Sequence, residues 1–178
     1  MAFEIRTEYD AAHLEELQWV LDQVLGRGIS AMNKKNHYLL GGVMLVAGAI
    51  IATQGGLQSV FGVLACGAGI YVIDHGRRYF MYTARKIRKK MPQIFTGNDY
   101  TIDEMGLQII NALGTAEYAY EDCSRLVETE NNLYLIMKDN QGMILDKANI
   151  EGGSVDELRT YLLEHCSVEL EKMEFPKK

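Results

Sequence analysis

The sequence predicts an α+β membrane protein, in which a two-helix transmembrane hairpin is joined to a cytosolic antiparallel β-meander closed by a C-terminal helix. Three observations predict this fold class. Residues 36–73 contain no Asp, Glu, Lys or Arg, although charged residues make up 24% of the 178-residue chain. Basic residues flank this stretch on both sides. After Pro92 apolar and polar residues alternate, as in half-buried strands, and a helix-capping sequence follows them.

Residues 1–35 predict a short strand followed by an amphipathic helix. The strand is expected at Phe3 to Thr7, where apolar and charged side chains alternate. Asp10 is expected to cap a helix that ends near Gly26 and Gly28. The apolar stripe of this helix consists of Leu14, Leu17, Leu21, Val24 and Leu25.

This stripe needs a partner, which is either the C-terminal domain or the membrane surface. The side of the helix expected to be polar carries Glu15, Glu16 and Asp22. These acids argue against an anionic membrane as the partner, because anionic lipids repel them.

Residues 36–73 are expected to form the transmembrane hairpin, with helices at 38–53 and 57–73 and a turn at 54–56. At 1.5 Å per residue each helix covers about 24 to 27 Å, slightly less than the ~30 Å hydrocarbon core unless the helices extend into their flanks. The alternative is a buried helical hairpin of a soluble protein. Core helices of soluble proteins rarely lack charge on every face, so the membrane hairpin is favoured.

Small residues gather on one face of each of these helices, which allows two helix backbones to approach closely in lipid. The residues expected to pack the hairpin are Gly41, Gly48 and Ala52 on the first helix, and Gly62, Cys66 and Gly69 on the second. Packing within the hairpin is the preferred interpretation over dimerisation, and a homo-oligomer is kept as an alternative.

Positive charge predicts the orientation of the hairpin. Lys34 and Lys35 precede it, a basic run follows it and the turn is uncharged. We therefore expect a multi-pass protein of the cell membrane with both ends of the chain in the cytoplasm. Residues 74–91 are expected to continue the second helix until Pro92 stops it. Residues 74–98 hold seven bases and one acid, a net charge of +6.

This basic segment is expected to contact the anionic inner leaflet, and nucleic-acid binding is the weaker alternative because the segment adjoins a membrane helix. The residues expected at the membrane surface are Arg77, Arg78, Arg85, Lys86, Arg88, Lys89 and Lys90, with Tyr79, Phe80 and Tyr82 at the depth of an aromatic belt.

Residues 92–178 predict the β-domain. Strands are expected at 100–103, 107–111, 115–119, 124–130, 133–138 and 143–146, separated by turn sequences. Ser154 and Glu157 form a capping-box sequence that opens a last helix, which turns Val155, Leu158, Leu162 and Cys166 towards one side. Residues 99–178 hold seventeen acids and seven bases, a net charge of −10, which lipid head groups and nucleic acid both repel.

The chain resembles the YcxB-like proteins, a bacterial group. The resemblance rests on the opening strand and helix, on the hairpin, and on the run YTIDEMGLQIINALGTAEYAYEDCSRLVETENNLYLIMKDNQGMILDKANI. It implies a two-helix membrane hairpin followed by a pleckstrin-homology-like (PH-like) β-domain. Two positions depart from the family pattern: Tyr120 stands where the family tends to have Trp, and Asp146-Lys147-Ala148 stands where it tends to have a Pro-Lys-Arg stretch.

No constellation in the sequence predicts an enzyme, a metal or a cofactor. The four histidines, His13, His37, His75 and His165, lack the spacing of a metal site or a catalytic triad. Asp74-His75 could relay protons beside a bilayer, but a solvated helix extension is the preferred interpretation. The three cysteines lack paired spacing for zinc, and no disulfide framework is expected. The glycine pairs do not form a phosphate-binding loop.

The function expected from the sequence is therefore a membrane-anchored cytosolic binding or scaffolding module, regulatory at the inner membrane, with a protein partner that the sequence does not name. Phosphoinositide capture is disfavoured, since the loops carry acids and only Lys138 and Lys147 as bases. The alternative is an accessory subunit of a membrane transport or stress-response complex that acts through its hairpin.

Overall fold

The computed structural model describes residues 2–90 and 97–176, and it is α+β. Pro92, the predicted end of the basic helix, lies outside the described residues. The chain forms two compact units, one of Met1–Leu25 with Ala84–Lys178 and one of Gly26–Thr83. The N-terminal segment thus joins the C-terminal residues in one unit. The division of the sequence into segments 1–35, 36–73, 74–91 and 92–178 stays a prediction.

The first sheet of the larger unit has the strand order β4-β3-β2-β1-β8, with all pairs antiparallel. Its strands are β1 (Phe3–Thr7), β2 (Asn98–Asp103), β3 (Gly106–Asn111), β4 (Gly114–Tyr118) and β8 (Ile150–Glu151). The predicted N-terminal strand is confirmed, and it lies inside the sheet between β2 and β8. Phe3 and Ile5, which alternate with charged residues, are buried on its inner face.

The second sheet has the order β7-β6-β5-β9. Its strands are β5 (Cys123–Glu128), β6 (Asn132–Met137), β7 (Gly142–Asp146) and β9 (Leu170–Lys172). The β5–β9 pair is parallel and the others are antiparallel. The Thr7 hydroxyl donates to the Ile144 carbonyl at 2.9 Å, which links β1 of the first sheet to β7 of the second.

All six predicted strands are present within two residues of their expected ends, but they do not form a single meander. The chain leaves the first sheet after Tyr118 through the short 3-10 helix η2 (Tyr120–Asp122), so β4 and β5 do not pair. The Tyr120 hydroxyl donates to the Asp103 and Gly106 carbonyls at 2.5 and 3.1 Å, which holds this corner against the β2–β3 turn.

Two helices cover the second sheet. α5 (Val155–Cys166) begins at the predicted capping box, in which Ser154 and Glu157 bond reciprocally, and it buries Leu158, Leu162 and Cys166. α1 (Ala11–Val24) begins at Asp10, whose carboxylate accepts from the amides of residues 12 and 13 at 2.7 Å. Every residue of β6 is buried, because both of its faces are covered.

The apolar stripe of α1 packs against the second sheet, which decides between its two predicted partners. Leu14, Leu17 and Leu21 share a core cluster with Tyr134 and Ile144. Two members of the predicted polar side are placed differently from the expectation, since Glu15 and Asp22 are 7% and 3% exposed. Ala84 belongs to the same cluster and Ile87 packs against it, so the core beneath α1 also includes residues outside the second sheet.

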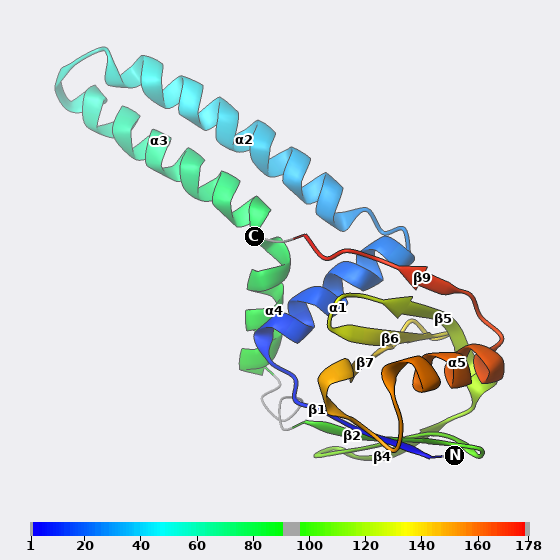
Figure 1. The fold of residues 1–178 in the computed structure, drawn as a ribbon. Helices are drawn as coiled ribbons and strands as arrows, with labels where there is room; N and C mark the ends of the chain where they lie inside the picture. Colours follow the sequence, from blue (N-terminus) through cyan, green and yellow to red (C-terminus); the bar gives the residue numbers. More distant parts are fainter. Residues whose placement is uncertain (1, 91–96, 177–178) are drawn as a thin grey trace. The chain divides into compact units, whose positions relative to one another are not determined.

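The smaller unit contains two long helices that lie side by side (Figure 1), α2 (Ile29–Ala52) and α3 (Gly56–Arg77). Met32–Ala52 and Gly56–Arg77 are long and apolar enough to cross a membrane. Both helices extend beyond the predicted 38–53 and 57–73. The turn between them uses Gly55 at φ +77°, a value that favours glycine.

The basic segment does not continue the second long helix, contrary to the expectation. α3 ends at Arg77, and a separate helix, α4, spans Tyr79–Lys90. The backbone leaves the helical conformation at Arg78, where φ is −105° and ψ is 23°. Its guanidinium pairs with Asp74 at 3.0 Å, one turn earlier.

Candidate functional site

The two long helices meet along the small residues that the sequence singles out. A Cβ added to Gly48 would lie 2.7 Å from the Gly62 carbonyl oxygen, and one added to Gly69 would lie 2.8 Å from the Gly41 carbonyl oxygen. A Cβ on Gly62 would overlap the backbone of Ala52. The Cys66 thiol donates to the Leu45 carbonyl at 3.6 Å. All six residues predicted to pack the hairpin therefore lie in its interface.

The outward surface of these helices is apolar. Leu39, Val46, Leu57, Leu64 and Ile70 are each 62% to 78% exposed. Only 11% of the most apolar window of each helix is buried inside the structure. A helical pair in the core of a soluble protein would instead bury most of this surface.

The seven basic residues predicted at the membrane surface, Arg77, Arg78, Arg85, Lys86, Arg88, Lys89 and Lys90, are all exposed. The opposite side of α4 is apolar, and its buried residue Ala84 belongs to the cluster beneath α1, together with the half-buried Ile87. The helix is thus amphipathic, with one side packed and one side basic.

In the part of the chain that the structure describes, no group of three His, Cys, Asp or Glu side chains could hold a metal ion. His13 contacts the capping carboxylate of Asp10, and His165 stacks on Tyr161. His37 and His75 are distant in sequence, but their ring centroids lie 5.7 Å apart across the hairpin. No sequence pattern indicated this contact.

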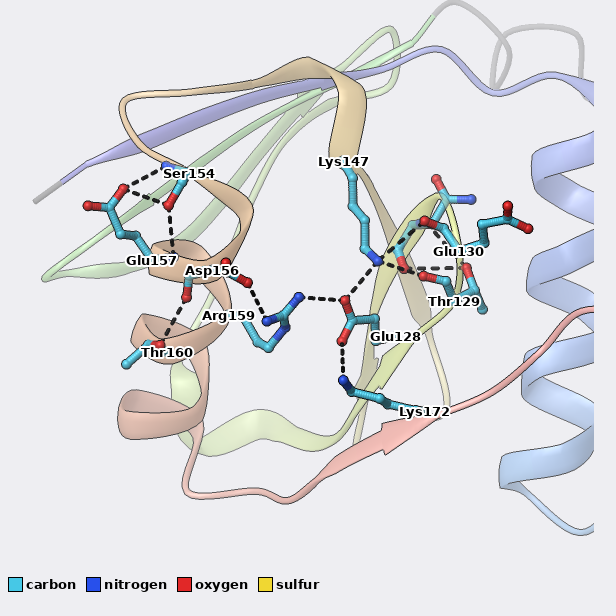
Figure 2. Close-up of polar contacts among 11 residues, drawn as sticks. Glu128, Thr129, Glu130, Lys147, Ser154, Asp156, Glu157, Arg159, Thr160 and Lys172 are labelled. Carbon is cyan, nitrogen blue, oxygen red and sulfur yellow. Dashed lines mark hydrogen bonds and ion pairs between the residues drawn. The ribbon is translucent and has the colours of Figure 1, made fainter.

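The larger unit contains a buried ion-pair network that the sequence analysis missed, centred on Glu128 at the end of β5 (Figure 2). Its Oε1 accepts hydrogen bonds from the Lys147 ammonium at 2.8 Å and the Arg159 guanidinium at 2.6 Å. Lys172 of β9 lies 3.9 Å from Oε2. Three cations from different segments of the chain therefore converge on one carboxylate that is 9% exposed.

The electrostatics of Glu128 favour a structural role over proton transfer. Burial alone would raise the pKa of this carboxyl group, but hydrogen bonds and charge from Lys147 and Arg159 outweigh it and hold the pKa below its usual 4.5. A carboxylate kept ionised in this way is a poor proton donor near neutral pH. Figure 2 shows that it instead ties β5 to α5 and β9.

An open cleft of about 940 Å³ lies beside this network. The described residues that line it are Glu16, Glu128, Thr129, Glu130, Asn131, Lys172, Met173, Glu174, Phe175 and Pro176. Four of them are acids and one is a base. The ring of Phe175 packs edge-on against Trp19, with centroids 5.4 Å apart. The cleft therefore combines carboxylate side chains with apolar surface.

Little in the sequence could have located this site. Glu128 follows the apolar pair Leu126-Val127 and so stands out as an acid in a buried strand, which is the one local signal. Its partners at positions 147, 159 and 172 are distant in sequence, and only the folded sheet brings them together.

Comparison of the chain with curated proteins finds no match. A family model described as YcxB-like protein matches residues 102–162. This segment runs from β2 into α5 and includes Glu128, Lys147 and Arg159. Residues 102–162, about a third of the chain, are therefore similar to the YcxB-like family, which agrees with the resemblance noted in the sequence.

Proposed function

We propose that the protein is a membrane-anchored binding module, in which the α2–α3 hairpin crosses the cell membrane and the β-domain captures a protein partner in the cytoplasm. The observation that carries the membrane anchor is the exposed apolar surface of two helices that already pack on each other through small residues. Such a surface is stable in lipid and costly in water.

The proposed topology places both termini in the cytoplasm. Lys34, Lys35 and the basic residues of α4 flank the hairpin, while its turn is uncharged. The basic side of α4 then faces anionic lipids of the inner leaflet, which adds to the anchor. The β-domain, with its negative charge, is repelled by the same lipids and stays available to a partner.

A PH-like fold is part of this proposal. The two sheets and the C-terminal helix α5 support it. A fold of this kind would present strand edges and loops to a ligand. The acidic cleft favours a protein partner over a phosphoinositide, because lipid phosphates are bound by clustered Lys and Arg.

Membrane topology is tested by thiol labelling in intact cells. Cys123 and Cys166 are buried, so they contribute little background to an impermeant maleimide. We expect Gln54→Cys, in the turn of the hairpin, to be labelled in intact cells. The matched variant Glu169→Cys, in an exposed position after α5, should be labelled only after lysis. Extraction of the protein by alkaline carbonate, or labelling of Glu169→Cys in intact cells, would contradict the proposal.

Site-specific photo-crosslinking separates this function from that of an accessory subunit acting through the hairpin. A photoreactive residue at position 131, on the acidic cleft, should yield partner adducts. The same residue at position 64, on the outward surface of α3, should yield lipid adducts only. Partner adducts confined to position 64 would favour the accessory subunit.

A further inference from the structure

Two buried thiols meet in the core of the β-domain. Cys123 is the first residue of β5, and Cys166 is the last residue of α5. They are 5% and 6% exposed, and both belong to the main core cluster. Both are free thiols in the structure. Cysteine spacing in the sequence gave no sign of this pair, because only the packing of α5 on the second sheet brings the two residues together.

A β-bulge turns Cys123 towards α5. The pairing of β5 with β6 shifts its register between Cys123 and Arg125. In a regular strand, positions 123 and 126 would face opposite sides of the sheet, because successive side chains alternate. With the bulge, Cys123 and Leu126 both lie in the cluster that contains Leu158 and Leu162 of α5. Bulges often re-aim a side chain in this way.

The helix presents the second thiol to the same cluster. Leu158, Leu162 and Cys166 are the buried residues of α5, and their spacing of four places them on one face of the helix. The Cys166 thiol donates a hydrogen bond to the sulfur of Cys123. The Cys123 thiol in turn donates to the Arg125 carbonyl at 3.5 Å. Two side chains whose sulfur atoms meet in this way are placed to form a disulfide.

The two thiols differ in how readily they ionise. The hydrogen bond from Cys166 outweighs burial and lowers the pKa of Cys123. The same hydrogen bond, together with burial, raises the pKa of Cys166. Because the thiolate is the nucleophilic form of cysteine, Cys123 is the sulfur that attacks first. Cys166 is then the thiol that resolves the product.

We propose that Cys123 and Cys166 are a reversible oxidation site, which hydrogen peroxide converts into a disulfide between β5 and α5. The Cys123 thiolate attacks one peroxide oxygen, the O–O bond breaks, and the departing hydroxide takes a proton from solvent to become water. The sulfur of Cys166 then attacks the resulting sulfenic acid, whose hydroxide leaves with the Cys166 proton as a second water. The two thiols thus supply the two electrons that reduce the peroxide.

Burial and location fit a small, diffusible oxidant. Both residues are nearly inaccessible to solvent, so a protein oxidant would reach them far less readily than peroxide. In the cytoplasm, where we place the β-domain, thiols are kept reduced at rest and disulfides are transient. A dithiol would reverse the bond by thiol–disulfide exchange. While the bond persists, the end of α5 is tied covalently to the start of β5.

Peptide mapping tests the site in the purified full-length chain in detergent micelles. After reduction, peroxide treatment and tryptic digestion, we expect one linked pair within a single chain, joining Cys123 to Cys166. The control Cys66→Ser, which alters the cysteine of the hairpin, should give the same pair. Linkage through Cys66, linkage only between chains, or no linked pair would overturn the proposal.

Two further variants test the order of attack. Cys166→Ser should accumulate sulfenic acid on Cys123, which dimedone traps as a stable adduct. Cys123→Ser should leave Cys166 unmodified at the same peroxide concentration. Equal trapping in the two variants would contradict the assigned roles.

A stability measurement needs no variant. The oxidised chain should unfold at a higher urea concentration than the same sample after treatment with dithiothreitol, because the disulfide constrains the unfolded chain. Both samples carry the same methionine oxidation, so the comparison reports the disulfide alone. An equal or lower midpoint for the oxidised sample would show that the fold does not accommodate the bond, and would overturn the proposal. The membrane topology and the protein partner are tested separately, so their failure is distinguishable from failure of this site.

Discussion

At the scale of single residues, Glu128 is held in place by two cations, because Lys147 and Arg159 both donate to it in a buried setting. Removing one partner of a buried ion pair costs more than the pair itself contributes, since uncompensated charge is left behind. The sequence predicted the strand that carries Glu128 but not its partners, because strand periodicity contains no information on residues 19 and 31 positions away.

Glu128→Gln should lower the free energy of unfolding by about 2 to 4 kcal/mol at pH 7. The measurement is a urea titration followed by the fluorescence of Trp19, the single tryptophan of the chain. Glu164→Gln, an exposed acid on α5, is the matched control and should change stability by less than about 0.5 kcal/mol. Equal urea midpoints for Glu128→Gln and the unmodified chain would show that the network contributes nothing.

The stability of the unmodified chain and that of Glu128→Gln should depend differently on pH. The folded state holds the pKa of Glu128 below its usual 4.5, so its ionised form stabilises the fold above that pH. This stabilisation is lost as the pH falls through the lower pKa of the folded state. The difference in urea midpoint between the unmodified chain and Glu128→Gln should therefore shrink in acid. A difference that is constant or grows below pH 4.5 would contradict this assignment.

At the scale of elements, the hairpin shows which features a sequence pattern determines. The charge-free run predicted two helices and their small-residue faces, but not their full lengths, since α2 begins at Ile29 among polar residues. The pattern also missed the break at Arg78. Helix ends depend on capping and local ion pairs, here Asp74 with Arg78, which hydropathy does not describe.

Gly62→Ala should weaken the α2–α3 interface, because the added Cβ would overlap the backbone of Ala52. Gly67→Ala on the same helix is the matched control, since its Cβ would meet nothing within 4 Å. Both changes raise helix propensity by a similar amount, so the difference between them reports packing. We expect Gly62→Ala to lose helical circular dichroism at a lower concentration of sodium dodecyl sulfate than the unmodified chain. Gly67→Ala should lose it at the same concentration as the unmodified chain. Identical titration curves would contradict the interface.

The basic side of α4 should bind anionic lipid through its charge. A peptide of residues 79–90 should partition onto vesicles that contain phosphatidylserine. Replacing its five bases by Gln should weaken binding by about 1 kcal/mol per residue near the surface. High salt should remove the difference between the two peptides. Equal partitioning at low salt would leave these residues with a role in topology only.

At the scale of the whole molecule, the chain places a long apolar insertion within one folded domain. The insertion interrupts the sequence between α1 and α4, yet β1 pairs with β2 across it. The sequence predicted the strand and helices on both sides of the insertion, and the apolar stripe of α1 indicated that this helix needed a partner. It did not show the two sheets, because strand order depends on contacts such as Tyr120 with Asp103 that no local pattern contains.

This architecture predicts that residues 1–26 joined to residues 84–178 by a Gly/Ser linker fold without the hairpin, as a soluble protein with one cooperative urea transition. Residues 92–178 alone should not fold, because they lack β1, an interior strand, and the helix that covers β6. Phe3, Ile5 and Val20 are at most 2% exposed, and each such side chain contributes roughly 1.5 to 3 kcal/mol when buried. Their loss together with that of the α1 leucines is comparable to the 5 to 15 kcal/mol that stabilises a typical domain. Far-UV circular dichroism in urea compares the two proteins directly. Equal midpoints would show that β1 and α1 are dispensable, and that the pairing of β1 with β2 does not hold the domain together.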